Sequence, residues 1–224
     1  VGGVKKGIGD SVVMSDEQNI CSMMFTSHNI YLPFETLRNC CKTNTGEISL
    51  EKLKGYTNYF DDNFEWYCNK DEMLFEEKLP EACDYCTKTE PNSVRHIWNR
   101  WKEPISEEQK DVIIGRDNVT YYEIVLSALC DLKCIYCEPK TSTTWDKELG
   151  TNYNYGSLEW KEEVLRQLYE HLDNKEWLPE TTYWFCFSGG EPTYGKDSIE
   201  TIKTIISKVP TNIPCEIIIH TNGN

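Results

Sequence analysis

Three cysteines near the middle of the chain are grouped as Cys130-x3-Cys134-x2-Cys137. They follow an apolar run, Tyr121–Ser127, which predicts a buried strand, so their thiolates should gather where that strand ends. Iron-sulfur clusters are held by cysteine thiolates, usually four, and a set of three leaves one iron able to bind an external ligand. The spacing therefore favours an iron-sulfur cluster. A zinc site that lacks one ligand, or three unrelated thiols, is the alternative.

Two polar groups follow later predicted strands. In the run Ser188–Thr193 (SGGEPT), two glycines allow positive φ and close approach of a ligand, and the carboxylate beside them would attract an ammonium group. A plain strand-exit turn is the alternative, and the Gly-Gly pair by itself favours it. In the run His220–Gly223 (HTNG), Thr221 and Asn222 could hydrogen-bond a sugar or a carboxylate, although such a run is more often a turn.

Alternating strands and helices must position these groups. Further strands are predicted at Thr182–Ser188 and Cys215–Thr221, because both are nearly continuous in apolar, β-branched or aromatic residues. Between the strands we predict a helix over Leu158–Leu172, capped by Ser157, and a second helix that opens on a capping box of Asp197 and Glu200 and ends at Pro210. The resulting β-α-β-α-β unit predicts parallel strands whose carboxyl ends carry the chemistry.

The first part of the chain differs from the second. Residues 22–41 predict a hairpin and Leu50–Tyr59 a short helix, and little other periodic apolar sequence is present. We therefore expect a small cysteine-bearing domain over residues 1–103, a polar linker over 104–118 and a second domain over 119–224. After the cysteine group, Trp145–Tyr155 is predicted to be a solvated loop, with a cover for the active site as the alternative.

Composition narrows the functional classes. Lys and Arg number 23 against 37 Asp and Glu, which gives a net charge of -14 and argues against a nucleic-acid partner. No apolar run is long enough to cross a membrane, and the first ten residues lack the features of a signal peptide. Eleven cysteines, an odd number grouped in clusters, are more typical of metal binding than of disulfides. We expect a cytoplasmic protein with no membrane partner.

The cysteine motif, with Tyr136 before its last member, and the Gly-Gly-Glu-Pro turn one strand later together resemble the radical S-adenosylmethionine (radical SAM) superfamily. The resemblance covers residues 118–224 and implies an α/β fold, a partial (β/α) barrel of which the first three strands are present. It implies that the three cysteines hold a [4Fe-4S] cluster whose open iron is chelated by S-adenosylmethionine (SAM). The residues that it assigns to SAM binding are Gly189, Gly190 and Glu191 for the methionine ammonium, Pro192 for the turn, the region of Tyr136 for adenine, and more weakly Thr221 and Asn222.

The N-terminal cysteines resemble the SPASM/twitch auxiliary-cluster module, placed here before the barrel. The resemblance implies a second iron-sulfur cluster with Cys21, Cys40, Cys83 and Cys86 as ligands, and Cys41 could replace Cys40. The glycine usual five positions before the second cysteine is absent, and Glu35 stands there. A structural zinc site with four cysteine ligands is the rival, because C-x2-C serves either metal.

The resemblance implies an enzyme that reductively cleaves SAM to a 5′-deoxyadenosyl radical and abstracts hydrogen from a peptide or small-molecule substrate, with ferredoxin or flavodoxin as electron donor. A synthase that rearranges a heterocycle or sugar would need no second cluster. Because barrels of this family continue beyond a third strand, the chain is expected to be a fragment or to be completed by a partner chain. A non-catalytic, metal-stabilised binding module, or a half-barrel awaiting its partner, is the alternative from another class.

Overall fold

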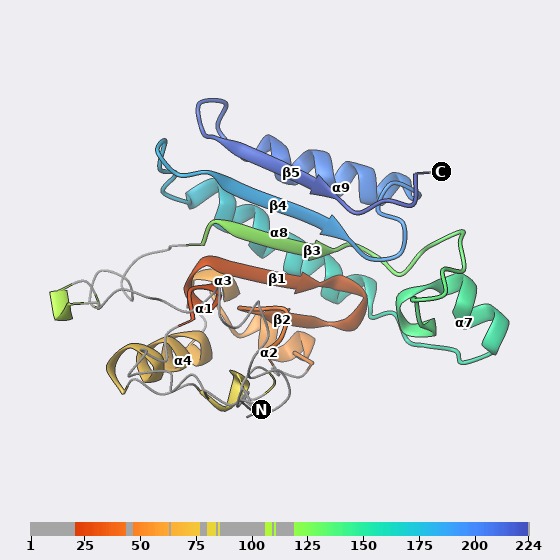
Figure 1. The fold of residues 1–224 in the computed structure, drawn as a ribbon, viewed down its shortest axis with the longest axis horizontal. Coiled ribbons are helices and arrows are strands. Elements are labelled where there is room, and N and C mark those ends of the chain that lie inside the picture. The colour runs from red at the N-terminus through yellow and green to blue at the C-terminus, as the bar shows by residue number, and fades with distance from the viewer. Residues whose placement is uncertain are drawn as a thin grey trace, which may run out of the picture.

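A computed structural model describes residues 21–43, 47–62, 64–76, 80–83, 85, 106–108, 110 and 119–223. Its centre is a single sheet of five strands in the order β2-β1-β3-β4-β5 (Figure 1). Strand β1 is antiparallel to β2, and every other neighbouring pair is parallel. The strands are β1 (Ser27–Tyr31), β2 (Thr36–Arg38), β3 (Tyr121–Val125), β4 (Tyr183–Ser188) and β5 (Cys215–Ile219).

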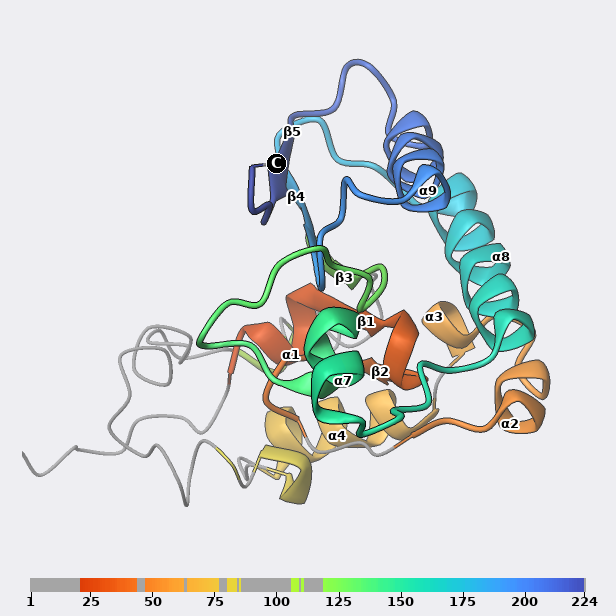
Figure 2. The same cartoon turned by 90° about the vertical axis from the view of Figure 1, so that its right-hand side faces the viewer.

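Helices cover one face of this sheet. Figure 2 shows α8 (Leu158–Asn174) and α9 (Lys196–Ser207) together on that side, with α2 (Leu50–Lys54) and α3 (Tyr59–Asp62) beside α8. The buried Gln167 on α8 joins them, because its side chain accepts the N–H of Tyr59 over 2.6 Å and donates to the Leu53 carbonyl over 3.2 Å. The other described elements are α1 (Met23–Thr26), η1 (Leu32–Phe34), α4 (Phe64–Phe75), η2 (Glu81–Cys83), η4 (Pro139–Thr141) and α7 (Thr143–Leu149).

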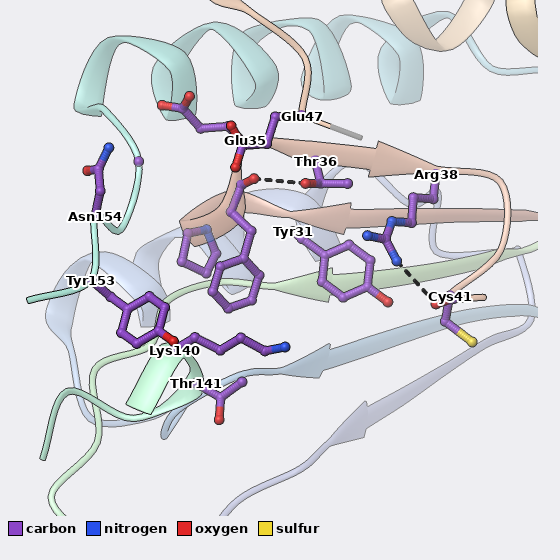
Figure 3. Close-up of a pocket in the computed structure, with 13 residues that line it drawn as sticks. Tyr31, Glu35, Thr36, Arg38, Cys41, Glu47, Lys140, Thr141, Tyr153 and Asn154 are labelled. Atoms are coloured by element: carbon purple, nitrogen blue, oxygen red, sulfur yellow. Dashed lines mark hydrogen bonds between the residues drawn. The ribbon is translucent and has the colours of Figure 1, made fainter. Parts of the chain in front are cut away.

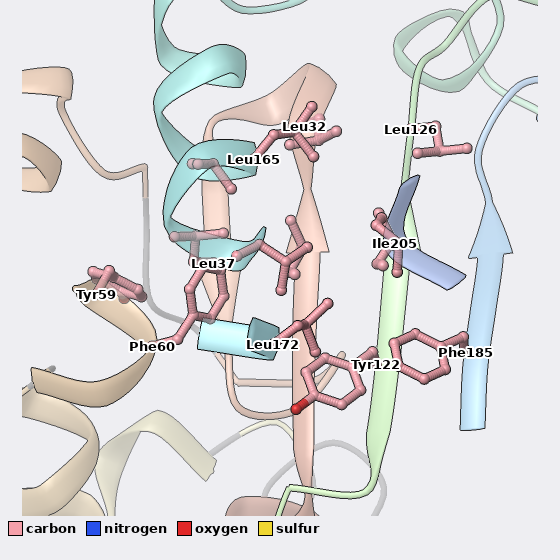
Figure 4. Packing of buried hydrophobic residues seen from close by; sticks show 14 of the residues in the cluster. Leu32, Leu37, Tyr59, Phe60, Tyr122, Leu126, Leu165, Leu172, Phe185 and Ile205 are labelled. Atoms are coloured by element: carbon pink, nitrogen blue, oxygen red, sulfur yellow. The ribbon is translucent and has the colours of Figure 1, made fainter. Parts of the chain in front are cut away.

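The main hydrophobic core lies between the sheet and these helices (Figure 4). Alternate residues of the strands face it: Tyr122 stacks on Phe185 with ring centroids 4.9 Å apart, and both are fully buried. Trp160 of α8 is also fully buried, and its indole N–H donates to the Ile48 carbonyl over 2.7 Å. Each such aromatic side chain removes a large apolar area from water, and together they hold the helices on the sheet.

The predicted strands and helices of the second half are confirmed, with strand ends that differ by up to two residues. Ser157 caps α8 as predicted, since its hydroxyl accepts the Trp160 N–H over 3.1 Å. The capping box of Asp197 and Glu200 is wrong. Helix α9 begins at Lys196 after Gly195, so Asp197 lies inside the first turn, where its charge still favours the helix dipole.

The predicted N-terminal hairpin forms, but it does not lie apart from the second half. Strand β1 pairs with β3 in parallel, with Ser27 opposite Tyr121 and Tyr31 opposite Val125. Apolar residues of the hairpin and of α2 and α3 share the main core with α8. The hairpin of the expected 1–103 domain is therefore part of the same sheet as the 119–224 region, while most of the expected linker 104–118 lies outside the described residues.

At the other end of the sheet, β5 pairs with β4, and no other strand in the described part of the chain covers its outer edge. Ile217, Ile218 and Ile219 are 49%, 36% and 39% exposed there. Across the described residues, no helix is both long and apolar enough to span a membrane.

Candidate functional site: the loops at the carboxyl ends of the parallel strands

The three motif cysteines lie on the loop that follows β3. Their thiols are free and half-buried, and the backbone N–H of Cys137 donates to the Cys134 carbonyl over 3.0 Å. Burial raises the pKa of Cys137, and the neighbouring Cys134 and Cys130 raise that pKa further because thiolates repel each other. Tyr136 is 86% exposed, and a hydrogen bond with Cys134 raises the pKa of its phenol. The effect of Cys134 and Cys130 on the pKa of Cys137 is consistent with the prediction that the three thiols gather where β3 ends.

The segment after the cysteines holds this loop in place. The N–H of Cys130 donates to the Thr143 hydroxyl over 3.3 Å, and the indole N–H of Trp145 donates to the Cys134 carbonyl over 2.9 Å. An ion pair joins Lys133 of the loop to Glu148 of α7. The prediction of a solvated loop from Trp145 is therefore wrong for its first residues, which form α7. The helix was missed because only Ser142 signals its start, by capping the Trp145 N–H.

The two glycines at the end of β4 lie against the backbone of the cysteine loop. Gly189 and Gly190 have φ of 86° and 43°, a region that favours glycine. A Cβ on Gly190 would lie 2.3 Å from the Leu129 carbonyl oxygen, and one on Gly189 would lie 2.4 Å from a Val125 methyl carbon. The close contacts that require glycine at positions 189 and 190 are therefore contacts with the protein's own chain.

Glu191 joins the ends of β4 and β5. The residue is 2% exposed, and its carboxylate accepts hydrogen bonds from the Thr193 N–H over 3.0 Å, the Thr221 hydroxyl over 2.9 Å and the Asn222 N–H over 2.6 Å. Burial by itself would raise the pKa of Glu191. Hydrogen bonds from the Thr193 hydroxyl, from the Asn222 and Thr193 N–H groups and from the Thr221 hydroxyl outweigh burial and lower that pKa. Glu191 therefore clamps two loops together, a role that sequence reasoning did not foresee, and its contact with a methionine ammonium stays a prediction.

Asn222 extends this clamp to the third loop. Its side-chain amide donates to the Asp131 carboxylate over 3.0 Å and lies 3.9 Å from the Cys130 sulfur. On the other side, the Glu191 N–H donates to the Leu129 carbonyl over 2.8 Å. The loops after β3, β4 and β5 therefore meet at the carboxyl ends of these strands, as expected for parallel strands. Of the predicted site residues, Gly189, Gly190, Glu191, Thr221 and Asn222 contact one another or the loop after β3, with Pro192 in the same turn as Glu191. Cys130 is the cysteine that lies beside them, and Cys134 and Cys137 follow further along its loop.

The thiols of this loop have the chemistry that an iron-sulfur cluster requires, three half-exposed cysteines on one segment. In the described part of the chain, no group of three or more His, Cys, Asp or Glu side chains is arranged so that it could hold a single metal ion. A cubane cluster takes one thiolate on each iron, so its ligands are spread over its corners and do not converge on a single point.

The N-terminal cysteines form a second group. A hydrogen bond with Cys41 raises the pKa of Cys40, burial raises it further, and charge repulsion from Cys41 and Cys21 adds to the rise. Cys21 and Cys83 both pack against a small second core of Met24, Phe25, Met73 and Leu74. Cys86, the fourth expected ligand, lies outside the described residues.

A pocket of about 590 Å³ opens between the β1-β2 hairpin and the segment that follows the cysteine loop (Figure 3). The hairpin contributes Tyr31 and Arg38, and the later segment contributes Lys140 and Tyr153. Sequence reasoning missed this pocket, because only the pairing of β1 with β3 brings the two segments together. The rest of its lining is Pro33, Phe34, Glu35, Thr36, Cys41, Glu47, Thr141, Asn154 and Gly156.

Comparison with known proteins gives no relative: no family model, no curated protein and no solved structure matches this chain.

Proposed function

We propose that this chain is the core of a radical SAM enzyme. The observation that carries the proposal is the meeting of three loops at the carboxyl ends of the parallel strands β3, β4 and β5. One of them holds Cys130, Cys134 and Cys137, and the Gly-Gly-Glu-Pro turn of the next strand is hydrogen-bonded to it. Two motifs that resemble the same superfamily are thus adjacent in space as well as ordered in sequence.

In this proposal Cys130, Cys134 and Cys137 hold a [4Fe-4S] cluster, and SAM binds beside it. When bound and reduced by an external donor, the cluster would supply the one electron that cleaves SAM into methionine and a 5′-deoxyadenosyl radical able to take hydrogen from a substrate C–H.

The protein's part in this chemistry is to position the bound groups and to shield them from water. The clamp from Glu191 through Asn222 to Asp131 keeps the three loops at fixed separations, which a reaction between bound groups requires. Trp145 and Thr143 hold the cysteine loop by its backbone and leave the thiols free to bind iron. Tyr136, at 86% exposure, is available to cover an adenine ring.

The N-terminal cysteines form the second part of the proposal. Cys21, Cys83, Cys86 and either Cys40 or Cys41 would hold an auxiliary iron-sulfur cluster, with zinc as the alternative metal. The packing of Cys21 and Cys83 against the same small core, and the interaction of Cys40 with Cys41 and Cys21, support a shared centre. The substrate would be a peptide or a small molecule and the electron donor a cytoplasmic ferredoxin or flavodoxin.

A non-catalytic metal-binding module, or a half-barrel completed by another chain, is the second candidate. The observation that favours it is the outer edge of β5, where three isoleucines are exposed. An exposed apolar strand edge pairs readily with another strand.

Anaerobic reconstitution with iron and sulfide, followed by SAM and dithionite, tests the proposal. We expect 5′-deoxyadenosine, and about eight irons per chain if both sites hold cubane clusters, or about four if only the β3 loop holds a cluster. Cys134→Ala should abolish deoxyadenosine formation and remove only the iron of the β3 loop. Cys215→Ala, a cysteine of β5 outside both groups, is the matched control and should change neither. Deoxyadenosine formation that survives Cys134→Ala would refute the proposal, and bound zinc without deoxyadenosine would favour the second candidate.

A further inference from the structure

We propose that the pocket between the β1-β2 hairpin and the η4 segment binds an anionic substrate, held by Arg38 and Lys140. The proposal rests on the proposed function only in taking the bound molecule as the substrate of that enzyme. The binding itself follows from the charges and packing of the pocket.

Arg38 carries the inference. It is half-buried, its Nε is buried without a hydrogen-bond partner, and its Nη1 reaches the Cys41 carbonyl only at 3.4 Å. No carboxylate in the described part of the chain forms an ion pair with it, in a protein whose net charge is -14. A half-buried guanidinium without a counter-ion costs free energy, whereas a carboxylate or phosphate would satisfy several of its N–H groups at once.

Lys140 supplies a second positive charge. Figure 3 shows Arg38 and Lys140 on opposite sides of the Tyr31 ring, both extending into the pocket. The Lys140 ammonium pairs with Glu138 over 2.9 Å, and both side chains are about half exposed. Exposed ion pairs of this kind contribute little, so an anionic ligand can compete for Lys140.

The carboxylates of the lining do not cancel these charges. Glu35 accepts the N–H of Ser157 over 2.7 Å, which commits one of its oxygens to the start of α8. Glu47 is solvent-exposed, and water screens it.

Aromatic rings provide the rest of the binding surface. Tyr31 lies under the Arg38 guanidinium, 5.3 Å from ring centroid to Cζ, and Phe34 and Tyr153 also line the pocket. A cavity of about 590 Å³ lies within the range of small-molecule sites. Its ligand is therefore a molecule with an apolar or aromatic body and one carboxylate or phosphate group.

The position of the pocket relates it to the proposed reaction. Tyr31 is opposite Val125, and Val125 is opposite Ser188, the residue before the Gly-Gly turn. Two strand spacings, about 10 Å, therefore separate Tyr31 from β4. Lys140 follows Cys137 by only three residues. A molecule in the pocket lies beside the loops that would hold the cluster and SAM.

Titration of the full chain, without SAM, by ligand-observed NMR tests the binding. The probes are N-acetyl-L-tyrosine, phenyl phosphate and the neutral N-acetyl-L-tyrosinamide. We expect one or both anions to bind, the amide to bind at least about ten-fold more weakly, and Arg38→Gln to weaken the anion at least about ten-fold. Lys140→Gln, at an exposed position that does not endanger folding, should weaken it in the same direction.

Arg166→Gln is the matched control, because Arg166 is an exposed arginine of α8 that pairs with Glu163 and Glu170 outside the pocket. It removes the same charge and should leave binding unchanged. Failure of both anions to bind, binding of the amide as tight as that of the anions, or undiminished binding in both pocket variants would overturn the proposal. Preference for the carboxylate or for the phosphate identifies the anionic group of the substrate.

The outcomes separate this proposal from the proposed function. Anion binding without any deoxyadenosine from SAM would support the anion site in the pocket and refute the proposed radical SAM activity. Deoxyadenosine without anion binding would support the proposed radical SAM activity and refute the anion site in the pocket.

Discussion

The carboxylate of Glu191, at the end of β4, accepts the backbone N–H of Asn222, beyond the end of β5, over 2.6 Å. Thirty-one residues separate the two in sequence, and the Asn222 side chain continues the connection to Asp131. A buried carboxylate with several donors around it is costly to change, because each donor would lose its partner.

Glu191→Gln should lower the free energy of unfolding by about 1–3 kcal/mol, because the new amide group would face N–H and O–H donors. Urea unfolding followed by circular dichroism measures the loss. Glu159→Gln, at an exposed carboxylate paired with Lys54, is the control and should change stability by less than about 1 kcal/mol. Equal effects of the two substitutions would contradict the clamp.

Gly190→Ala should be much more destabilising than Gly150→Ala. Both glycines have positive φ, 43° and 63°, so backbone strain of about 1 kcal/mol is common to both. Only at Gly190 would the new Cβ meet a backbone atom, the Leu129 oxygen at 2.3 Å, whereas Gly150 has nothing within 4 Å. The urea midpoints of the two variants test this, and similar midpoints would show that the turn is not packed as described.

Trp145→Phe should loosen the cysteine loop. The substitution keeps an aromatic ring and removes the indole N–H that donates to the Cys134 carbonyl, a loss of about 1 kcal/mol, or roughly five-fold in the ratio of ordered to disordered loop. In the reconstituted protein we expect faster loss of the visible cluster absorption in air. Trp184→Phe removes a similar bond, to Glu216 on β5, and should leave that rate unchanged.

Stability should fall on mild acidification because of His28. Burial lowers its pKa well below 6.5, and the nearby His171, Lys70 and Lys175 lower it further. The unfolded chain therefore takes up a proton below pH 6.5 that the folded chain does not, and stability falls by at most about 1.4 kcal/mol per pH unit until the folded pKa is reached. Above pH 6.5 both states are neutral at this residue, so its contribution is flat.

Urea unfolding between pH 8 and 5 measures the slope, and His28→Gln should reduce it. An unchanged slope in that variant would assign the acid sensitivity to another group. Glu191 does not affect the slope in this range. A carboxylate whose pKa is lowered in the folded chain stabilises the fold above its ordinary pKa of 4.5, and that stabilisation is lost only as the pH falls below 4.5.

Local patterns predicted the elements of the second half well. The runs that became β3, β4 and β5 are largely apolar and rich in aromatic or β-branched residues, and the Leu165, Leu168 and Leu172 spacing matches the buried face of α8. The start of α9 and the existence of α7 were harder to predict, because caps and short helices depend on one or two side chains.

The sequence by itself determined the cysteine motif, its place after a buried strand and the parallel unit around it, since these follow from spacing and periodicity within a few residues. Only the tertiary structure decided that the N-terminal hairpin joins the same sheet, that Glu191 holds Asn222, and that Arg38 and Lys140 share a pocket. Each of these pairings joins residues 30 or more positions apart. The free energy that selects such neighbours comes from packing of the whole core, which no local pattern contains.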